Sequence, residues 1–190
     1  KTLLFILTAL IVLSCKAQSP VVAIDANYSS ASNGTYFKDL NNEMEKFVGT
    51  WIYSSNGDIF TLSLKKKESV FNGKHYEDVL VGEYKYVANG IEVVNTLSNI
   101  NNINPAKHHV FGNFILPCDG CSDSDRKFNL IFEDSLRTYL GASITLHYLV
   151  DNNPEEIKVL LIAEDSTLLP NENSPTTLRV PYGTYTMIKQ

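Results

Sequence analysis

Residues 49–64 read GTWIYSSNGDIFTLSL, and this stretch decides the fold that we expect. The Asn-Gly pair at positions 56–57 separates two runs rich in β-branched and aromatic residues, which is the strongest short signal of a β-hairpin. In the second run, Phe60, Leu62 and Leu64 alternate with polar residues, so one face of that strand is predicted to be buried. The folded core is therefore expected to begin with an antiparallel pair of strands.

The same pattern continues along the rest of the chain. A second hairpin is predicted at Asn89-Gly90, and residues 65–68, KKKE, are interpreted as a basic turn between the two hairpins. The remaining predicted strands cover residues 76–87, 91–97, 109–116, 127–133, 143–150, 157–163 and 182–188. About eight to ten short strands with regular turns favour an all-β fold, either an antiparallel up-and-down barrel or, as the alternative, a β-sandwich.

One short helix is predicted before the strands, over residues 36–47. Its apolar residues lie at spacings of three and four and would form one stripe: Phe37, Leu40, Met44 and Phe47. Asp39 is the candidate N-cap.

The N-terminus has the build of a secretory signal, with Lys1 followed by an apolar run that ends at Ser14. The run is too short to span a membrane, which needs about 20 apolar residues. Residues 12–15, VLSC, resemble the lipobox of bacterial lipoproteins, and the resemblance implies cleavage before Cys15 and lipid on that cysteine. Cleavage after Ala17 without lipid and an N-terminal core helix are the alternatives.

These observations divide the chain into a signal peptide (residues 1–14), a lipidated cysteine with a flexible tether (15–34) and a single β-barrel domain (35–190). Small polar residues dominate the predicted tether, although Val21, Val22 and Ile24 are compatible with a short strand. The chain has 190 residues, of which 44% are hydrophobic and 19% charged, so it can bury one core. Its net charge of −5 gives no support for nucleic-acid binding.

Two resemblances concern the predicted barrel. Gly49 and Trp51 form a G-x-W start of the first strand that resembles that of lipocalins, in which the tryptophan closes one barrel end and a late arginine packs across it; Arg179 is the matching arginine. The wider pattern is similar to uncharacterised lipoprotein domains of Gram-negative envelopes, through the lipobox, the G-T-W triplet and the hairpin GEYKYVANGIE at residues 82–92. The second resemblance implies a fold and a compartment over about residues 47–190, but no activity.

Cys118 and Cys121 flank an Asp-Gly turn and are expected to form a local disulfide outside the cytoplasm. A thioredoxin-like redox pair and a zinc site completed by His108 and His109 are the alternatives. The nearby acidic residues Asp119, Asp123 and Asp125 are interpreted as a solvated turn, since the glutamate that closes a calcium loop is missing at the required spacing.

No catalytic, metal or cofactor motif is visible, and we expect no enzyme activity and no cofactor. The expected function is that of a lipid-anchored lipoprotein of the bacterial outer membrane that binds a small apolar ligand or lipid inside the barrel. The candidate pocket residues are Tyr84, Tyr86 and Tyr148. A structural or protein-interaction module of the envelope is the alternative. An enzyme would require a cleft in which His108, His109 or His147 meets a carboxylate or Cys118.

Overall fold

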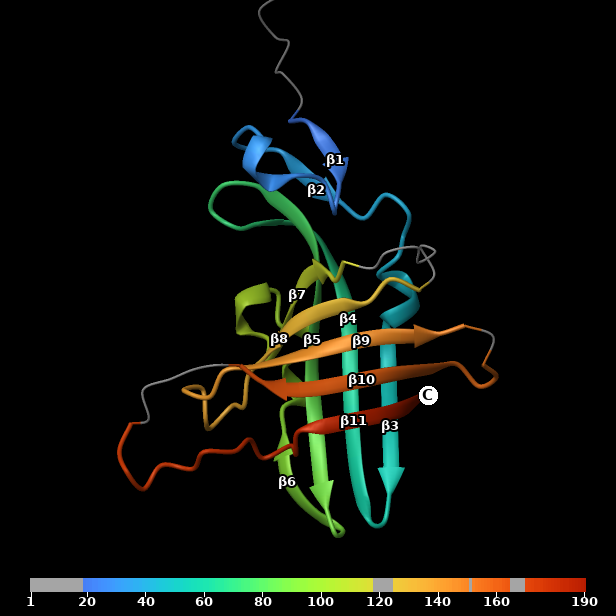
Figure 1. Cartoon of the computed structure of the whole chain (residues 1–190), viewed down its shortest axis with the longest axis vertical. Helices are drawn as coiled ribbons and strands as arrows, with labels where there is room; N and C mark the ends of the chain where they lie inside the picture. Colours follow the sequence, from blue (N-terminus) through green and yellow to red (C-terminus); the bar gives the residue numbers. More distant parts are fainter. Residues whose placement is uncertain (1–18, 118–124, 151, 165–169) are drawn as a thin grey trace, which may run out of the picture.

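The computed structural model describes residues 19–117, 125–150, 152–164 and 170–190, and these form an all-β structure (Figure 1). Eight of the described strands close into an antiparallel barrel: β3 (Gly49–Ser55), β4 (Asp58–Phe71), β5 (Tyr76–Ala88), β7 (Val110–Ile115), β8 (Phe128–Phe132), β9 (Ala142–Leu149), β10 (Glu156–Ala163) and β11 (Gly183–Lys189). Each strand pairs with the next in this order, and β11 pairs with β3 to close the barrel. The predicted up-and-down barrel is confirmed.

Both predicted Asn-Gly turns are present. Asn56 and Gly57 have φ of 52° and 88°, and Asn89 and Gly90 have φ of 49° and 80°. Two successive residues with positive φ are the requirement of a type I′ turn, which matches the twist of the strands it joins. The two turns lie side by side, because Gly90 N donates a hydrogen bond to Gly57 O at 3.1 Å.

The basic turn predicted at residues 65–68 is wrong, because β4 runs straight through it. Lys65, Lys66 and Lys67 pair in register with Val81, Leu80 and Val79 of β5. The chain reverses only after Phe71, so β4 and β5 extend beyond the barrel as a two-stranded arm (Figure 1). The sequence-based prediction failed here because a run of lysines is rarely buried in a strand.

The N-terminal segment packs on this arm. Strand β1 (Val21–Ala23) pairs in parallel with β2 (Tyr36–Lys38), and β2 pairs in parallel with β5. The 3₁₀ turn η1 (Tyr28–Ser30) lies between β1 and β2. We call residues 19–38 together with the arm (residues 67–79) the cap. Part of the segment predicted as a tether is thus folded, including the short strand expected near Val21.

Residues 36–47 do not form the predicted helix; they form β2, a loop and the 3₁₀ turn η2 (Glu45–Phe47). Phe37, Met44 and Phe47 are buried as the stripe predicts, but Leu40 is 55% exposed. Asp39 explains why the backbone departs from the predicted helix. Its side chain accepts hydrogen bonds from the backbone N–H of Glu43 and Met44 at 2.8 and 3.0 Å. The carboxylate caps these backbone groups, as expected of an N-cap, but the chain that follows makes only a single turn.

One further strand and two turns connect β5 to β7. Strand β6 (Ile91–Asn95) pairs with the C-terminal part of β5, and η3 (Leu97–Asn101) and η4 (Pro105–Lys107) follow it. Strand β7 then pairs with the middle of β5, from Leu80 to Gly82. Gly82 is required there, since a Cβ at this position would lie 2.7 Å from Leu64 Cδ2 and 2.9 Å from Ser63 O.

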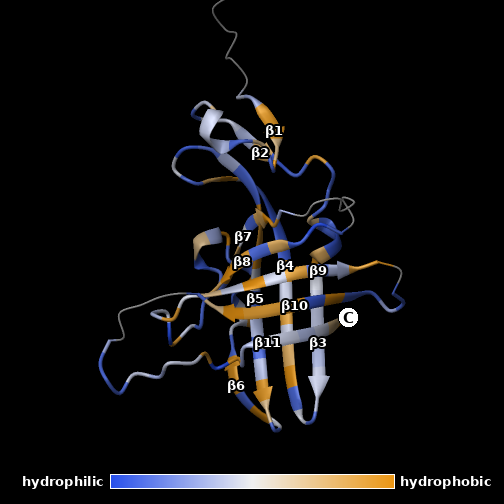
Figure 2. Cartoon of the chain, viewed as in Figure 1, coloured by the Kyte–Doolittle hydropathy of each residue, from blue (hydrophilic) through white to orange (hydrophobic). Residues whose placement is uncertain are grey.

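The barrel interior is a packed apolar core to which every barrel strand contributes. Figure 2 shows apolar residues along the barrel strands and mostly polar residues in the long connections. The largest side chains that are fully buried include Trp51, Phe60, Tyr84, Phe128 and Phe132. In the part of the chain that is described, no helix has the length and apolar character needed to cross a membrane.

Candidate functional site

Trp51 is buried in the core near the start of β3. Its indole N–H donates a hydrogen bond to Phe47 O at 2.8 Å, and its ring is fully buried. Lys189 Nζ lies 5.3 Å from the ring centroid, within the range of a cation–π contact. Gly49 makes room for this lysine, because a Cβ at Gly49, where φ is 136°, would lie 3.1 Å from Lys189 Cε.

Arg179 lies at the other end of the barrel from Trp51. Trp51 contacts Tyr148, near the C-terminal end of β9, whereas Arg179 binds Asp134 in the loop before β9. The Arg179 side chain donates to Asp134 Oδ1 at 2.8 Å, and its backbone N–H donates to Asp134 Oδ2 at 2.8 Å. The structure therefore pairs Trp51 with Lys189 rather than with the predicted arginine.

The hydroxyls of the three tyrosines predicted to line a pocket each bind a different partner. The Tyr84 hydroxyl donates to Glu133 O at 3.1 Å, the Tyr86 hydroxyl to Asp58 at 3.0 Å, and the Tyr148 hydroxyl to Glu155 at 2.7 Å. Tyr84 and Tyr86 belong to the packed core, with Phe60 against both rings. Eight strands are few enough for side chains to fill a barrel, and the core described above occupies this one.

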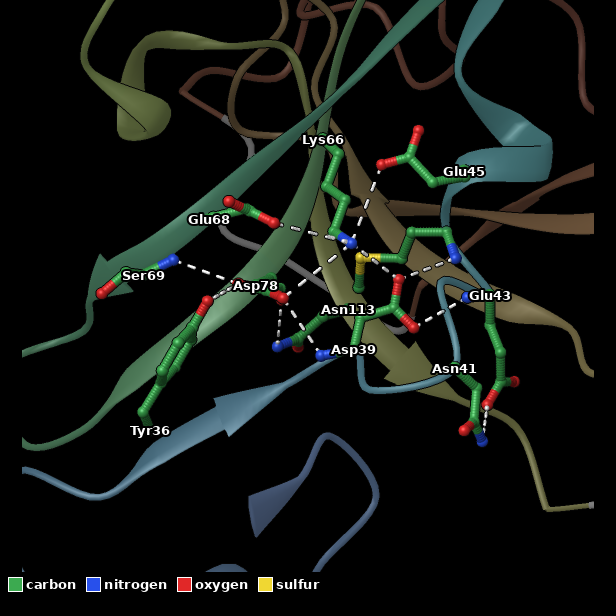
Figure 3. A network of polar contacts seen from close by, with 11 residues as sticks. Tyr36, Asp39, Asn41, Glu43, Glu45, Lys66, Glu68, Ser69, Asp78 and Asn113 are labelled. Atoms are coloured by element: carbon green, nitrogen blue, oxygen red, sulfur yellow. Dashed lines mark hydrogen bonds and ion pairs between the residues drawn. The ribbon is translucent and has the colours of Figure 1, made fainter. Parts of the chain in front are cut away.

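A buried charge network joins the cap to the barrel (Figure 3). Lys66 Nζ lies 3.0 Å from Asp39 Oδ2 and 4.0 Å from Asp78 Oδ2, and both carboxylates are fully buried. Asp78 also accepts hydrogen bonds from the backbone N–H of Asp39 and of Ser69, at 3.0 and 3.1 Å. Burial alone would lower the pKa of Lys66, but the surrounding carboxylates, with Asp39 the nearest, outweigh it and raise that pKa.

The cap also holds a cavity of about 360 Å³ that opens between the N-terminal segment and β7. Its lining combines apolar and polar side chains, namely Ile24, Asp25, Ala26, Tyr28, Glu77, Asn113, Phe114 and Ile115. This volume falls within the range of small-molecule sites, which are mostly apolar with a few convergent polar groups. The cavity lies outside the barrel interior.

Glu77 is the central polar group of this cavity. Only 9% of the residue is exposed, and its Oε2 accepts hydrogen bonds from the Tyr28 hydroxyl and from Asn113 Nδ2, the latter at 3.1 Å. Burial and the hydrogen bond to Glu77 raise the pKa of Tyr28, so the phenol stays protonated and serves as a donor. Tyr28 is positioned by Phe37, on which its ring stacks at 3.8 Å between centroids. Glu77 also borders a second cavity, of about 330 Å³.

A second polar cluster lies on the outer face of β5. Glu83 is fully buried, and its two oxygens contact His108 Nδ1 at 3.1 Å and His109 Nδ1 at 2.7 Å. His108 Nε2 lies 3.1 Å from Asn102 O, so the pair ties the connection between β6 and β7 to the barrel wall. The hydrogen bond to Glu83 raises the pKa of His109, against the opposing effect of burial. The contact between histidine and carboxylate that an enzyme would require is present here. The side chains of His108 and Glu83 have no exposed surface, however, so these two groups do not line an open cleft.

Several predicted site residues lie outside the described residues: Cys15, Cys118 and Cys121. The lipid anchor and the disulfide therefore stay predictions. In the described ranges, no group of three or more His, Cys, Asp or Glu side chains is arranged to hold a metal ion. His147 lies on β9 with its side chain partly exposed, and burial lowers its pKa.

The cavity residues were not identified from the sequence. Tyr28 and Asn113 lie 49 and 36 positions from Glu77, so no local spacing connects them. The one available signal is the position of Glu77 and Asp78 directly before the apolar run of β5, where two adjacent acidic residues are unusual in a strand.

Comparison with known proteins gives one match. The whole chain, residues 1–190, fits the model of a family of unknown function, DUF6705. No curated protein matches the chain, and no solved structure does.

Proposed function

We propose that this chain, which belongs to DUF6705, a family of unknown function, is a lipid-anchored envelope protein. In this proposal it binds a small molecule in the cap. The anchor is supported by residues 12–15, VLSC, and by the secretory build of the apolar run before them. Strand β1 begins at Val21, six positions after Cys15, so an anchor on Cys15 holds the cap, rather than the opposite barrel end, next to the membrane.

The observation that carries the binding role is the cavity beside Glu77. The barrel interior holds the buried apolar core described above, so we place the ligand in the cap cavity rather than among the core side chains. The cap cavity offers about 360 Å³, apolar walls and a polar centre held in place by Tyr28 and Asn113. In this proposal the barrel is a rigid scaffold and the cap is the binding element.

Native mass spectrometry of the protein extracted from its own membrane tests both parts. A diacyl or triacyl mass on Cys15 that is lost in Cys15→Ser supports the anchor, and a mature protein without Cys15 refutes it. A co-purifying small molecule supports the binding role if Ala26→Phe, which fills the cavity, removes it. The matched control is Ala163→Phe on the exposed end of β10, which should retain the molecule. Retention of the molecule by Ala26→Phe refutes binding at this cavity.

The second candidate function is a protein-interaction module of the envelope. It is favoured by apolar side chains on the outer face of β7 and β8, where Phe114 is 59% exposed and Ile131 is 63% exposed. A photo-crosslinking residue at position 114 should then capture one envelope protein reproducibly, while the same residue at exposed Lys158 should not. Absence of a position-specific crosslink counts against this function.

A further inference from the structure

We infer that the cavity beside Glu77 selects organic cations, namely ammonium ions attached to a short hydrocarbon. This inference rests on the proposed binding function and names the ligand class for the same site. It follows from the hydrogen-bonding capacity that the cavity has left, from the charge at its centre and from the character of its walls.

The side-chain donors of Tyr28 and Asn113 are already used within the protein. The Tyr28 hydroxyl donates to Glu77, and the two N–H groups of Asn113 donate to Glu77 Oε2 and to Asp78 O, both at 3.1 Å. A phenol has one O–H and a primary amide has two N–H groups, so neither side chain has a donor left. The carboxylate, the phenol oxygen and the amide oxygen keep acceptor capacity. The site therefore favours a ligand that donates hydrogen bonds.

The charge at the centre of the cavity points to a cationic donor. Within the described residues, no lysine, arginine or histidine forms an ion pair with Glu77. Its charge is balanced only by neutral donors, and a buried charge without a counterion is costly. Asp25, the other acid of the lining, is paired with Arg126 at 2.9 Å. A bound cation would compensate Glu77 and form a charge-assisted hydrogen bond, which is about twice as strong as a neutral one.

The walls specify the rest of the ligand. Ile24, Ala26, Phe114 and Ile115 surround the polar centre with apolar surface. Phe114 is 59% exposed and Tyr28 is 38% exposed, so both rings retain surface that a ligand can cover. A strongly hydrated inorganic cation gains nothing from such walls, whereas an alkylammonium ion gains affinity by burying its hydrocarbon against them. The preferred ligand thus combines one ammonium group with an apolar body.

The test compares two probes of nearly equal shape on the isotopically labelled full chain: n-pentylammonium chloride and 1-pentanol. At pH 7 the amine carries its charge, since alkylamines titrate near pH 10. Backbone amide signals of β1, η1 and Asn113 should shift saturably with pentylammonium, and the affinity for pentanol should be at least about tenfold lower. Glu77→Gln keeps an acceptor for Tyr28 but removes the charge, and should weaken pentylammonium binding by about tenfold or more.

The matched control is Glu68→Gln, which removes an exposed carboxylate of the same arm and should leave the affinity for pentylammonium within about twofold. Equal affinities for the two probes overturn the inference, and this comparison does not depend on any variant folding. If pentanol binds as well as pentylammonium, the cavity is a ligand site without charge selection, so the proposed function stands and this inference fails. If neither probe binds and no molecule co-purifies with the protein, both fail.

Discussion

Lys66 is the cation on which the junction between the cap and the barrel depends, and its replacement by methionine measures that junction. The variant Lys66→Met keeps the apolar stem of the side chain but removes the ammonium group at its end. It leaves Asp39 and Asp78 fully buried without the cation that lies 3.0 and 4.0 Å from them. Breaking a buried ion pair by removing one partner typically costs about 3–5 kcal/mol.

We expect the loss to lie near the lower limit, about 3 kcal/mol. Both carboxylates keep hydrogen bonds from the backbone, which still stabilise their charged forms: Asp39 accepts from Glu43 and Met44, and Asp78 accepts from Ser69. Urea unfolding followed by tryptophan fluorescence measures the loss, because Trp51 is the only tryptophan and is fully buried. The free energy of unfolding follows from the midpoint and the slope of the transition.

Two comparisons make the result decisive. Lys158→Met, at an exposed position of β10, should change the free energy of unfolding by less than about 0.5 kcal/mol. Lys66→Arg, which retains a cation, should lose less than Lys66→Met, because Asp39 and Asp78 keep a counterion. A loss below about 1 kcal/mol for Lys66→Met would refute the reasoning, since it would show that water or other groups compensate the two carboxylates.

Three further predictions concern the barrel. Gly82→Ala should lower the free energy of unfolding by about 1–3 kcal/mol in the same assay, because its Cβ would overlap Leu64 and the backbone of Ser63; an unchanged midpoint would contradict the packing described there. The pKa of His109 is raised in the folded protein, so the contact between His109 and Glu83 should contribute fully to the free energy of unfolding below pH 6.5. That contribution should decline as the pH rises through the raised pKa. His109→Gln should remove this part of the pH dependence, and an unaltered pH profile would argue against the contact with Glu83. Arg179→Met should cost about 2–4 kcal/mol by leaving buried Asp134 without its cation, whereas Arg137→Met, which affects a more exposed side chain, should cost less; equal losses would refute the assignment.

The barrel was predictable because its determinants are local. The Asn-Gly pairs at 56–57 and 89–90 need only their own positive φ values, and the alternation from Phe60 to Leu64 is visible in consecutive residues. A strand pattern of period two with a turn at its end defines an antiparallel pair without knowledge of the rest of the chain. Closure itself is not local, because β3 pairs with β11 across most of the chain, and the local pattern alone therefore left a β-sandwich as the alternative.

The cap was not predictable because its determinants are distant in sequence. Lys66 is compatible with a strand only because Asp39 and Asp78 surround it, and neither is a neighbour in the sequence. The spacing of Phe37, Met44 and Phe47 is helical, yet the side chain of Asp39 holds the backbone in another path. The cavity likewise combines side chains from η1, β5 and β7, whose meeting depends on the complete fold. The predicted pairing of Trp51 with Arg179 failed for the same reason, since a residue type alone does not specify which cation reaches the ring.

The closure of the barrel by β11 has a consequence for how the chain is made. Trp51 and Ile52 of β3 pair with Lys189 and Ile188, so the first and last barrel strands meet only when residues 183–189 are available. A nascent chain that contains β10 but not yet β11 exposes two unpaired sheet edges, β3 and β10, to neighbouring chains. Closure of this barrel is therefore expected to wait until β11 has been synthesised, to be slow because β3 and β11 close a long loop, and to require protection of those edges until then.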